Sequence, residues 1–247
     1  MGKEKRIRIG VVQFNSKTDE PGENLEKAVN YIENLVEEEV DLVLLPEMFN
    51  SGYGTDEGVI KSAIEMQEET IETLSALSDY NDIAIVGGVV NKTGEDLYNS
   101  SVIMLPYGEP VYYNKTHLFR NEKNVFKPGN SLKSFEFAGV KFGILMCYEI
   151  GFPEISRKLS REGAQVLLVP FAFGRERREI YEVATRARAI ENGCFLAAAS
   201  QSGRCPSMEM VGENRIVSPS GEIIRDCGNG EGFCLADLDI HQVERYR

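Results

Sequence analysis

Three chemically reactive side chains each lie at the end of an apolar, strand-like run. Glu47 follows DLVLLP, Lys115 follows VYYN, and Cys147 follows FGILM. A carboxylate can transfer protons, an ammonium group stabilises developing negative charge, and a thiol can act as a nucleophile. Each residue alone also fits a structural role, as an exposed loop acid, a strand-edge lysine or a small core residue. Only their convergence in space would give the set a chemical meaning.

The surroundings of Cys147 are the most informative of the three. A buried strand is expected to end at this residue, and a helix is expected to begin near Pro153. Such a strand–turn–helix exposes the thiol at the strand end and places backbone N–H groups beside it, where they can hold an oxyanion. A nearby helix N-terminus also lowers the pKa of a thiol. The pattern therefore predicts an accessible cysteine with a lowered pKa.

Histidines and metal-binding patterns are scarce. His117 and His241 are the only histidines, so a cysteine–histidine pair would have to use His117. The spacings HxH, HExxH and CxxC do not occur in the sequence. The five cysteines are odd in number and widely spaced, so we expect free thiols, with structural roles for Cys194, Cys227 and Cys234. Chemistry without a metal or cofactor is the better interpretation.

Composition limits the classes of partner. The 247 residues include 27 basic and 39 acidic side chains, which gives a net charge of −12. Such a surface repels phosphate backbones and anionic lipids, so we expect neither nucleic acid nor a membrane as partner. No apolar run approaches the roughly 20 residues that span a bilayer, and the N-terminal segment lacks the apolar stretch of a secretory signal. We expect a cytoplasmic protein with one domain, residues 1–247.

Strand-like runs alternate with amphipathic stretches along the chain. About four helices are expected, over residues 24–39, 55–79, 153–162 and 178–191. Buried or paired strands are expected over residues 6–14, 41–45, 82–90, 165–169, 195–200, 214–226 (as strand–turn–strand) and 233–238. An antiparallel meander is expected from the pieces 101–105, 110–114, 132–137 and 140–146. This mixture predicts a layered α/β domain with more than one sheet.

Together, the segments LLPEMF, YNKTHLF and GILMCYEIGFPE resemble, in that order, the glutamate, lysine and cysteine motifs of the nitrilase superfamily of carbon–nitrogen hydrolases. NEKNVFKPGN resembles the family loop that carries an assisting glutamate, here Glu122, and ATRARAIENGCF resembles its arginine- and glutamate-bearing helix. IRIGVVQFN and NRIVSPSGEII resemble the first strand and a late hairpin, so the resemblance covers nearly the whole chain. It implies a four-layer α-β-β-α sandwich of two mixed β-sheets flanked by helices, in a homodimer or larger homo-oligomer.

The resemblance also implies a mechanism. Cys147 would attack the carbonyl carbon of a small amide while Glu47 takes the thiol proton. Lys115 and the backbone N–H of Tyr148 would hold the tetrahedral oxyanion, and Glu122 would orient Lys115 and the substrate. Ammonia or an amine would leave, and water would then hydrolyse the thioester. The side chains expected to contact the substrate are Tyr148, Tyr53, Phe171 and Phe173.

One departure from the family pattern bears on the substrate. Many members have an arginine where this chain has Gly151, and arginines just after the cysteine can bind a substrate carboxylate. Its absence favours a neutral aliphatic amide over an ω-amide or an N-carbamoyl amino acid. Arg175 or Arg177 could replace it, although the charge run that also includes Arg178 is typical of a solvated helix start.

Three other functions compete with amide hydrolysis. A nitrile hydrolase of the same fold would use the same three residues. A catalytically silent protein would use the scaffold only for binding, but would then be free to lose Glu47, Lys115 and Cys147. A thiol hydrolase would pair Cys147 with His117, in which case replacing His117 would abolish activity.

Overall fold

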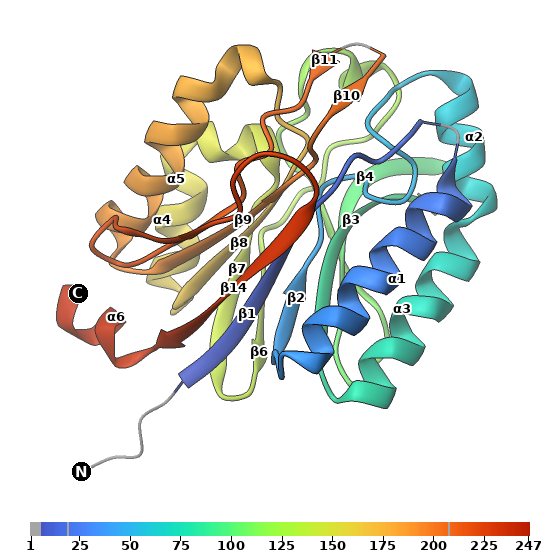
Figure 1. Cartoon of the computed structure of the whole chain (residues 1–247). Coiled ribbons are helices and arrows are strands. Elements are labelled where there is room, and N and C mark those ends of the chain that lie inside the picture. The colour runs from blue at the N-terminus through green and yellow to red at the C-terminus, as the bar shows by residue number, and fades with distance from the viewer. Residues whose placement is uncertain (1–5, 19, 207) are drawn as a thin grey trace.

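Two six-stranded β-sheets pack face to face in the computed structural model, which describes residues 6–18, 20–206 and 208–247 (Figure 1). In spatial order, the first sheet consists of β14 (Gly232–Asp239), β1 (Arg6–Gln13), β2 (Leu42–Leu44), β3 (Ala84–Thr93), β4 (Asp96–Met104) and β5 (Val111–Asn114). The second consists of β13 (Ile223–Asp226), β12 (Arg215–Val217), β9 (Phe195–Ser200), β8 (Val166–Phe171), β7 (Val140–Ile144) and β6 (Lys133–Phe137). A small ribbon pairs β10 (Arg204–Cys205) with β11 (Met208–Glu209).

Helices cover the outer face of each sheet. The first sheet is covered by α1 (Pro21–Glu37), α2 (Glu57–Glu65) and α3 (Gln67–Asn81), and the second by α4 (Pro153–Arg161) and α5 (Arg178–Asn192), as Figure 1 shows. The short helix α6 (His241–Tyr246) follows β14. Three 3₁₀ turns lie between strands: η1 (Arg120–Asn124), η2 (Cys147–Gly151) and η3 (Arg175–Arg177). The expected four-layer α-β-β-α sandwich is confirmed.

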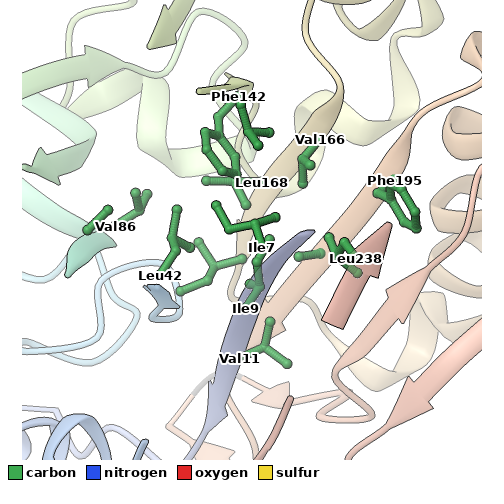
Figure 2. Packing of buried hydrophobic residues seen from close by; sticks show 14 of the residues in the cluster. Ile7, Ile9, Val11, Leu42, Val86, Phe142, Val166, Leu168, Phe195 and Leu238 are labelled. Carbon is green, nitrogen blue, oxygen red and sulfur yellow. The ribbon is translucent and has the colours of Figure 1, made fainter. Parts of the chain in front are cut away.

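Apolar side chains fill all three interfaces between the layers. Between the sheets, Ile7 and Leu42 of the first pack against Phe142 and Leu168 of the second (Figure 2). A separate cluster joins α1 and α3 to the first sheet, and another joins α4 and α5 to the second. The helix α1 shows the periodicity behind this packing, because its buried positions Leu25, Ala28, Ile32 and Leu35 recur every three or four residues.

Strands from the two sheets meet at their carboxyl ends. Each sheet contains three adjacent parallel strands, β1–β2–β3 and β7–β8–β9. Just beyond β2, the backbone N–H of Glu47 donates to the carbonyl of Phe171, the last residue of β8, at 3.3 Å. The segment after a strand of one sheet therefore contacts a strand end of the other, and the seam between the sheets holds the residues described below.

The expected antiparallel meander over residues 101–146 is wrong. The strands β4 and β5 pair in the first sheet, whereas β6 and β7 pair in the second. The pairings are antiparallel as expected, but residues 115–132 cross from one sheet to the other instead of forming a tight turn. This crossing segment begins with Lys115 and includes Glu122 on η1.

The helices and cysteines also differ from expectation. The helix expected over residues 55–79 is interrupted at Met66, which separates α2 from α3, and α6 was not expected. The described residues therefore contain six α-helices rather than about four.

The cysteines are not all free thiols, because Cys227 and Cys234 form a disulfide between the end of β13 and β14, with Cα atoms 5.3 Å apart. Of the N-terminal segment discussed above, residues 1–5 lie outside the described residues. No described helix combines the length and apolarity needed to span a bilayer.

Candidate active site

Glu47 follows β2 after Leu45 and Pro46, and its carboxylate is fully buried. One carboxylate oxygen, Oε1, accepts hydrogen bonds from Lys115 Nζ at 2.7 Å and Asn99 Nδ2 at 2.8 Å. The other, Oε2, accepts from the backbone N–H of Ala172 at 3.0 Å. Its backbone packs on Gly88 of β3, where an added Cβ would lie 2.4 Å from Glu47 Cα. Glycine at position 88 thus allows the close backbone approach that seats this carboxylate.

Lys115 lies at the end of β5 and its side chain has no exposed surface. Its Nζ lies 2.7 Å from Glu47 Oε1 and 3.0 Å from Glu122 Oε1. Burial lowers the pKa of Lys115, but the two carboxylates outweigh this effect and hold the pKa well above its ordinary value. The side chain is therefore a permanent ammonium, shared by two carboxylates and fixed in position.

Glu122 lies on η1, in the segment that crosses between the sheets. Besides Lys115, its Oε1 accepts a hydrogen bond from the Tyr53 hydroxyl at 2.8 Å, and its Oε2 accepts one from the backbone N–H of Phe119 at 2.9 Å. Asn99 Nδ2 lies 3.4 Å from the same Oε1 and so connects Glu122 with Glu47. Burial and the Glu122 carboxylate raise the pKa of Tyr53, which stays a neutral donor.

Cys147 begins η2, just after β7, in a backbone conformation that non-glycine residues seldom adopt (φ +44°). The expectation of an accessible thiol with a lowered pKa is wrong: the residue is only 4% exposed, and burial and the Glu47 carboxylate raise the pKa well above its ordinary value. Lys115 and the backbone N–H of Ala172 lower the pKa, but do not compensate. The resting sulfur is thus a protonated thiol beside a carboxylate that can accept its proton.

Glu149 connects the thiol turn with the lysine segment, a role that the sequence did not reveal. Its buried carboxylate accepts hydrogen bonds from five donors, the hydroxyls of Tyr113 and Thr116 and the backbone N–H groups of Thr116, His117 and Met146. Met146 directly precedes Cys147, and Thr116 directly follows Lys115. A single carboxylate therefore holds together the two backbone segments that carry the thiol and the ammonium.

The expected substrate-contacting side chains have different surroundings. Tyr53 and Glu122 border a cleft of about 400 Å³, together with Phe119, Asp56 and Met208. The Tyr148 ring packs edge to face on Phe152. Phe171 and Phe173 are almost completely buried and pack at right angles on each other, and Phe171 also packs on Tyr181 in the core under α5.

His117 makes a different set of contacts. Its ring packs on Phe152, with centroids 4.2 Å apart, and its Nδ1 lies 2.8 Å from the Thr116 hydroxyl. Among residues 6–18, 20–206 and 208–247, no hydrogen bond joins the ring to Cys147. The geometry therefore gives no support to a cysteine–histidine pair.

A buried carboxylate, ammonium and thiol thus lie at the seam of the α-β-β-α sandwich, a set of groups whose chemistry suits a hydrolase. Comparison with known proteins specifies the family. The family model described as carbon–nitrogen hydrolase matches residues 8–247, and the chain belongs to this family, within the nitrilase superfamily.

Individual relatives are similar along nearly their whole length. The chain is 32% identical to a nitrilase from Pyrococcus abyssi, over 98% of this chain and 93% of that protein. It is 32% identical to the 2-oxoglutaramate amidase of Bacillus subtilis, over 97% and 93%. A mutant amidase from Nesterenkonia sp., solved with the acetamide moiety of fluoroacetamide added covalently at its active site cysteine, superposes with a TM-score of 0.89, at 25% identity over 100% of this chain and 95% of that one.

Proposed function

We propose that this protein hydrolyses the carbon–nitrogen bond of a small amide, releasing a carboxylate and ammonia through a thioester on Cys147. The observation that carries the proposal is the Lys115 ammonium, buried without exposed surface between Glu47 and Glu122 and electrostatically coupled to the thiol. A buried cation of this kind is placed to stabilise negative charge that develops on a substrate oxygen. Several relatives with amidase names are consistent with this activity.

The proposed first half-reaction forms the thioester. Cys147 Sγ attacks the amide carbonyl carbon while its proton passes to Glu47. Lys115 and the backbone N–H of Tyr148 stabilise the resulting oxyanion. The carbon–nitrogen bond then breaks, and Glu47 returns the proton to the departing nitrogen. Because the resting thiol has a raised pKa, attack depends on proton transfer to Glu47 rather than on a preformed thiolate.

The second half-reaction consumes water. Glu47 removes a proton from a water molecule, whose oxygen attacks the thioester carbonyl carbon. The tetrahedral intermediate collapses with cleavage of the carbon–sulfur bond, and the sulfur regains the proton from Glu47. Throughout, Glu122 keeps Lys115 in place and receives the Tyr53 hydroxyl bond. Each carboxylate thus has one task, proton transfer for Glu47 and orientation for Glu122.

Single substitutions test these roles. Cys147→Ala is expected to lower kcat for amide hydrolysis by at least about 10³-fold, because the covalent route disappears. Lys115→Ala is expected to abolish activity, whereas His117→Ala is expected to leave most of it. Ammonia release measures all three variants. Activity that survives in Cys147→Ala, or loss only in His117→Ala, would remove the proposed mechanism.

A nitrile substrate is the competing proposal, because the nitrilase from Pyrococcus abyssi is among the similar proteins. Amides and their matching nitriles separate the two activities. Turnover of the amide alone supports the amidase, and faster turnover of the nitrile supports the nitrilase. A silent binding protein would turn over neither compound.

We also propose that the protein forms a homodimer or larger homo-oligomer through the outer face of α5. The side chains of Val183, Ile190 and Ile180 on this helix are 69%, 52% and 44% exposed, respectively. Their spacing places them on one side of the helix, and apolar groups gathered there are typical of an association surface. Light scattering is expected to give at least a dimer, and Val183→Glu is expected to yield monomers. A monomeric wild-type protein would contradict the proposal.

A further inference from the structure

Asn99, in β4, contacts both carboxylates of the active site. Its Nδ2 lies 2.8 Å from Glu47 Oε1 and 3.4 Å from Glu122 Oε1. The ammonium of Lys115 lies 2.7 Å and 3.0 Å from the same two oxygens. All four side chains are almost completely buried. Two donors, one neutral and one charged, therefore hold the same pair of carboxylate oxygens.

These contacts leave one place for a proton on the Glu47 carboxylate. Each carboxylate oxygen has two lone pairs that can accept a hydrogen bond. Both lone pairs of Oε1 are used, by Lys115 and Asn99. In the described part of the chain Oε2 accepts only one hydrogen bond, from the backbone N–H of Ala172. The remaining lone pair of Oε2 is thus the one that can take a proton.

The sulfur of Cys147 lies on the Oε2 side of this carboxylate. The Ala172 N–H that donates to Glu47 Oε2 also forms a hydrogen bond with Cys147 and lowers the pKa of the thiol. One backbone donor is therefore shared by the nucleophile and the oxygen that can accept its proton. Two observations, the remaining lone pair and the shared N–H group, thus select the same oxygen.

The two carboxylates together create a competing site for the proton. Buried carboxylates that share a site hold a proton between them, because both cannot stay charged without compensation. A proton held between Oε1 of Glu47 and Oε1 of Glu122 would no longer be at Oε2, where the departing nitrogen must receive it. The Asn99 N–H occupies this position instead. Because an amide does not release its proton, it separates the two carboxylates without neutralising either.

We propose that Asn99 is a positioning residue that keeps the catalytic proton on Glu47 Oε2 by occupying the oxygens that face each other between Glu47 and Glu122. This inference rests on the proposed amide hydrolysis and assigns different tasks to the two oxygens of one carboxylate. Oε2 takes the thiol proton as the carbon–sulfur bond forms, and gives it to the nitrogen as the carbon–nitrogen bond breaks. Oε1 keeps its hydrogen bonds to Lys115 and Asn99 throughout.

Two substrates that give the same acyl-enzyme separate this role from a general loss of structure. One is the short aliphatic amide that the wild type hydrolyses fastest, and the other is the S-methyl thioester of the same acid. The departing nitrogen of the amide must receive a proton, whereas methanethiolate can leave without one. Asn99→Leu is expected to lower kcat/KM for the amide by about 10- to 100-fold, almost wholly through kcat. For the thioester, kcat/KM should fall by less than about threefold.

Asn99→Ala is the second variant, because it adds no volume to the buried site, and it should show the same selective loss. The control is Ser101→Ala, on the same face of β4 and two residues further along the strand. The Ser101 side chain is fully buried, and its hydroxyl has no hydrogen-bond partner among the described residues. Its replacement should change the amide-to-thioester ratio by less than about twofold.

Asn99 variants that lose both activities in parallel, keep both, or fail to fold would overturn the proton-positioning role and leave amide hydrolysis standing. A wild type that does not hydrolyse both compounds would overturn the proposed thioester route, and this inference with it.

Discussion

Replacing Glu149 with glutamine tests whether one carboxylate aligns the thiol with the lysine. The carboxylate accepts from five donors, and Oε2 is the acceptor for the backbone N–H of Met146. A glutamine offers only one oxygen, and most of the donors face Oε1. Its NH₂ group would therefore face Met146 N–H, donor against donor, just before Cys147.

The size of the effect follows from these contacts. Loss of one hydrogen bond to a charged acceptor costs about 1.5–3 kcal/mol, and the buried N–H left without an acceptor adds about 1–3 kcal/mol. We therefore expect Glu149→Gln to lower the free energy of unfolding by about 3–5 kcal/mol and Tm by roughly 10 °C. A shift of the thiol turn by about 1 Å would lower kcat by about 10²-fold.

Urea unfolding and ammonia-release kinetics on the same variants measure both effects. Glu149→Asp keeps the charge and should recover a large part of the stability and of kcat. Glu136→Gln, an exposed substitution on β6, is the matched control and should change stability by less than about 0.5 kcal/mol. If Glu149→Gln matches the control in stability and kcat, the carboxylate does not hold the two segments together and our reasoning fails.

Three further predictions concern the strand packing, the thiol and the disulfide. Gly88→Ala would place a Cβ 2.4 Å from Glu47 Cα, so it should cost at least about 2 kcal/mol of stability and about 10²-fold in kcat. Gly22→Ala is the control and should change neither, because no atom lies within 4 Å of its new Cβ. Unfolding and turnover measurements compare the two variants. Because burial and Glu47 raise the pKa of Cys147, this thiol should stay protonated above pH 9.0, where an ordinary cysteine ionises. The free energy of unfolding should therefore fall as pH rises past that value, because the unfolded chain releases the proton first. A thiolate absorbance step below pH 9.0 that Cys147→Ser removes would refute this. The Cys227–Cys234 disulfide closes a short loop, and the loss of chain entropy in the unfolded state contributes about 2.5 kcal/mol of stability. Reductant or Cys234→Ser should therefore lower the free energy of unfolding by about that amount. Equal stability with and without reductant would contradict the prediction.

The sequence was sufficient to predict the layers, and Glu47 and Lys115, two of the residues that it singled out, form a buried ion pair in the structure. Continuous apolar runs such as the one before Glu47 indicate strands covered on both faces, and these strands do lie between two other layers. The motif order then predicted a family that the comparisons confirm. Such patterns can be interpreted from the sequence alone because the residues that form them are close together in the chain.

Other features depend on contacts between distant segments and could not be predicted locally. Cys147 is buried in the cluster formed by the second sheet and the helices that cover it, so the shift of its pKa is opposite to the one expected from a nearby helix terminus. The five donors of Glu149 come from segments about 30 residues apart. The disulfide forms because β13 and β14, which belong to different sheets, approach each other. The crossing of the chain from one sheet to the other after Lys115 could be predicted only if the strand pairing were known.

The crossing segment has a consequence for how activity arises during folding. Residues up to 130 contain both carboxylates and the ammonium, while the nucleophile belongs to the later part of the chain. A folding intermediate in which the two sheets have formed but have not docked would therefore have native secondary structure and no turnover. Recovery of enzymatic activity after dilution from denaturant should thus report the final docking of the two sheets, later than the recovery of circular dichroism.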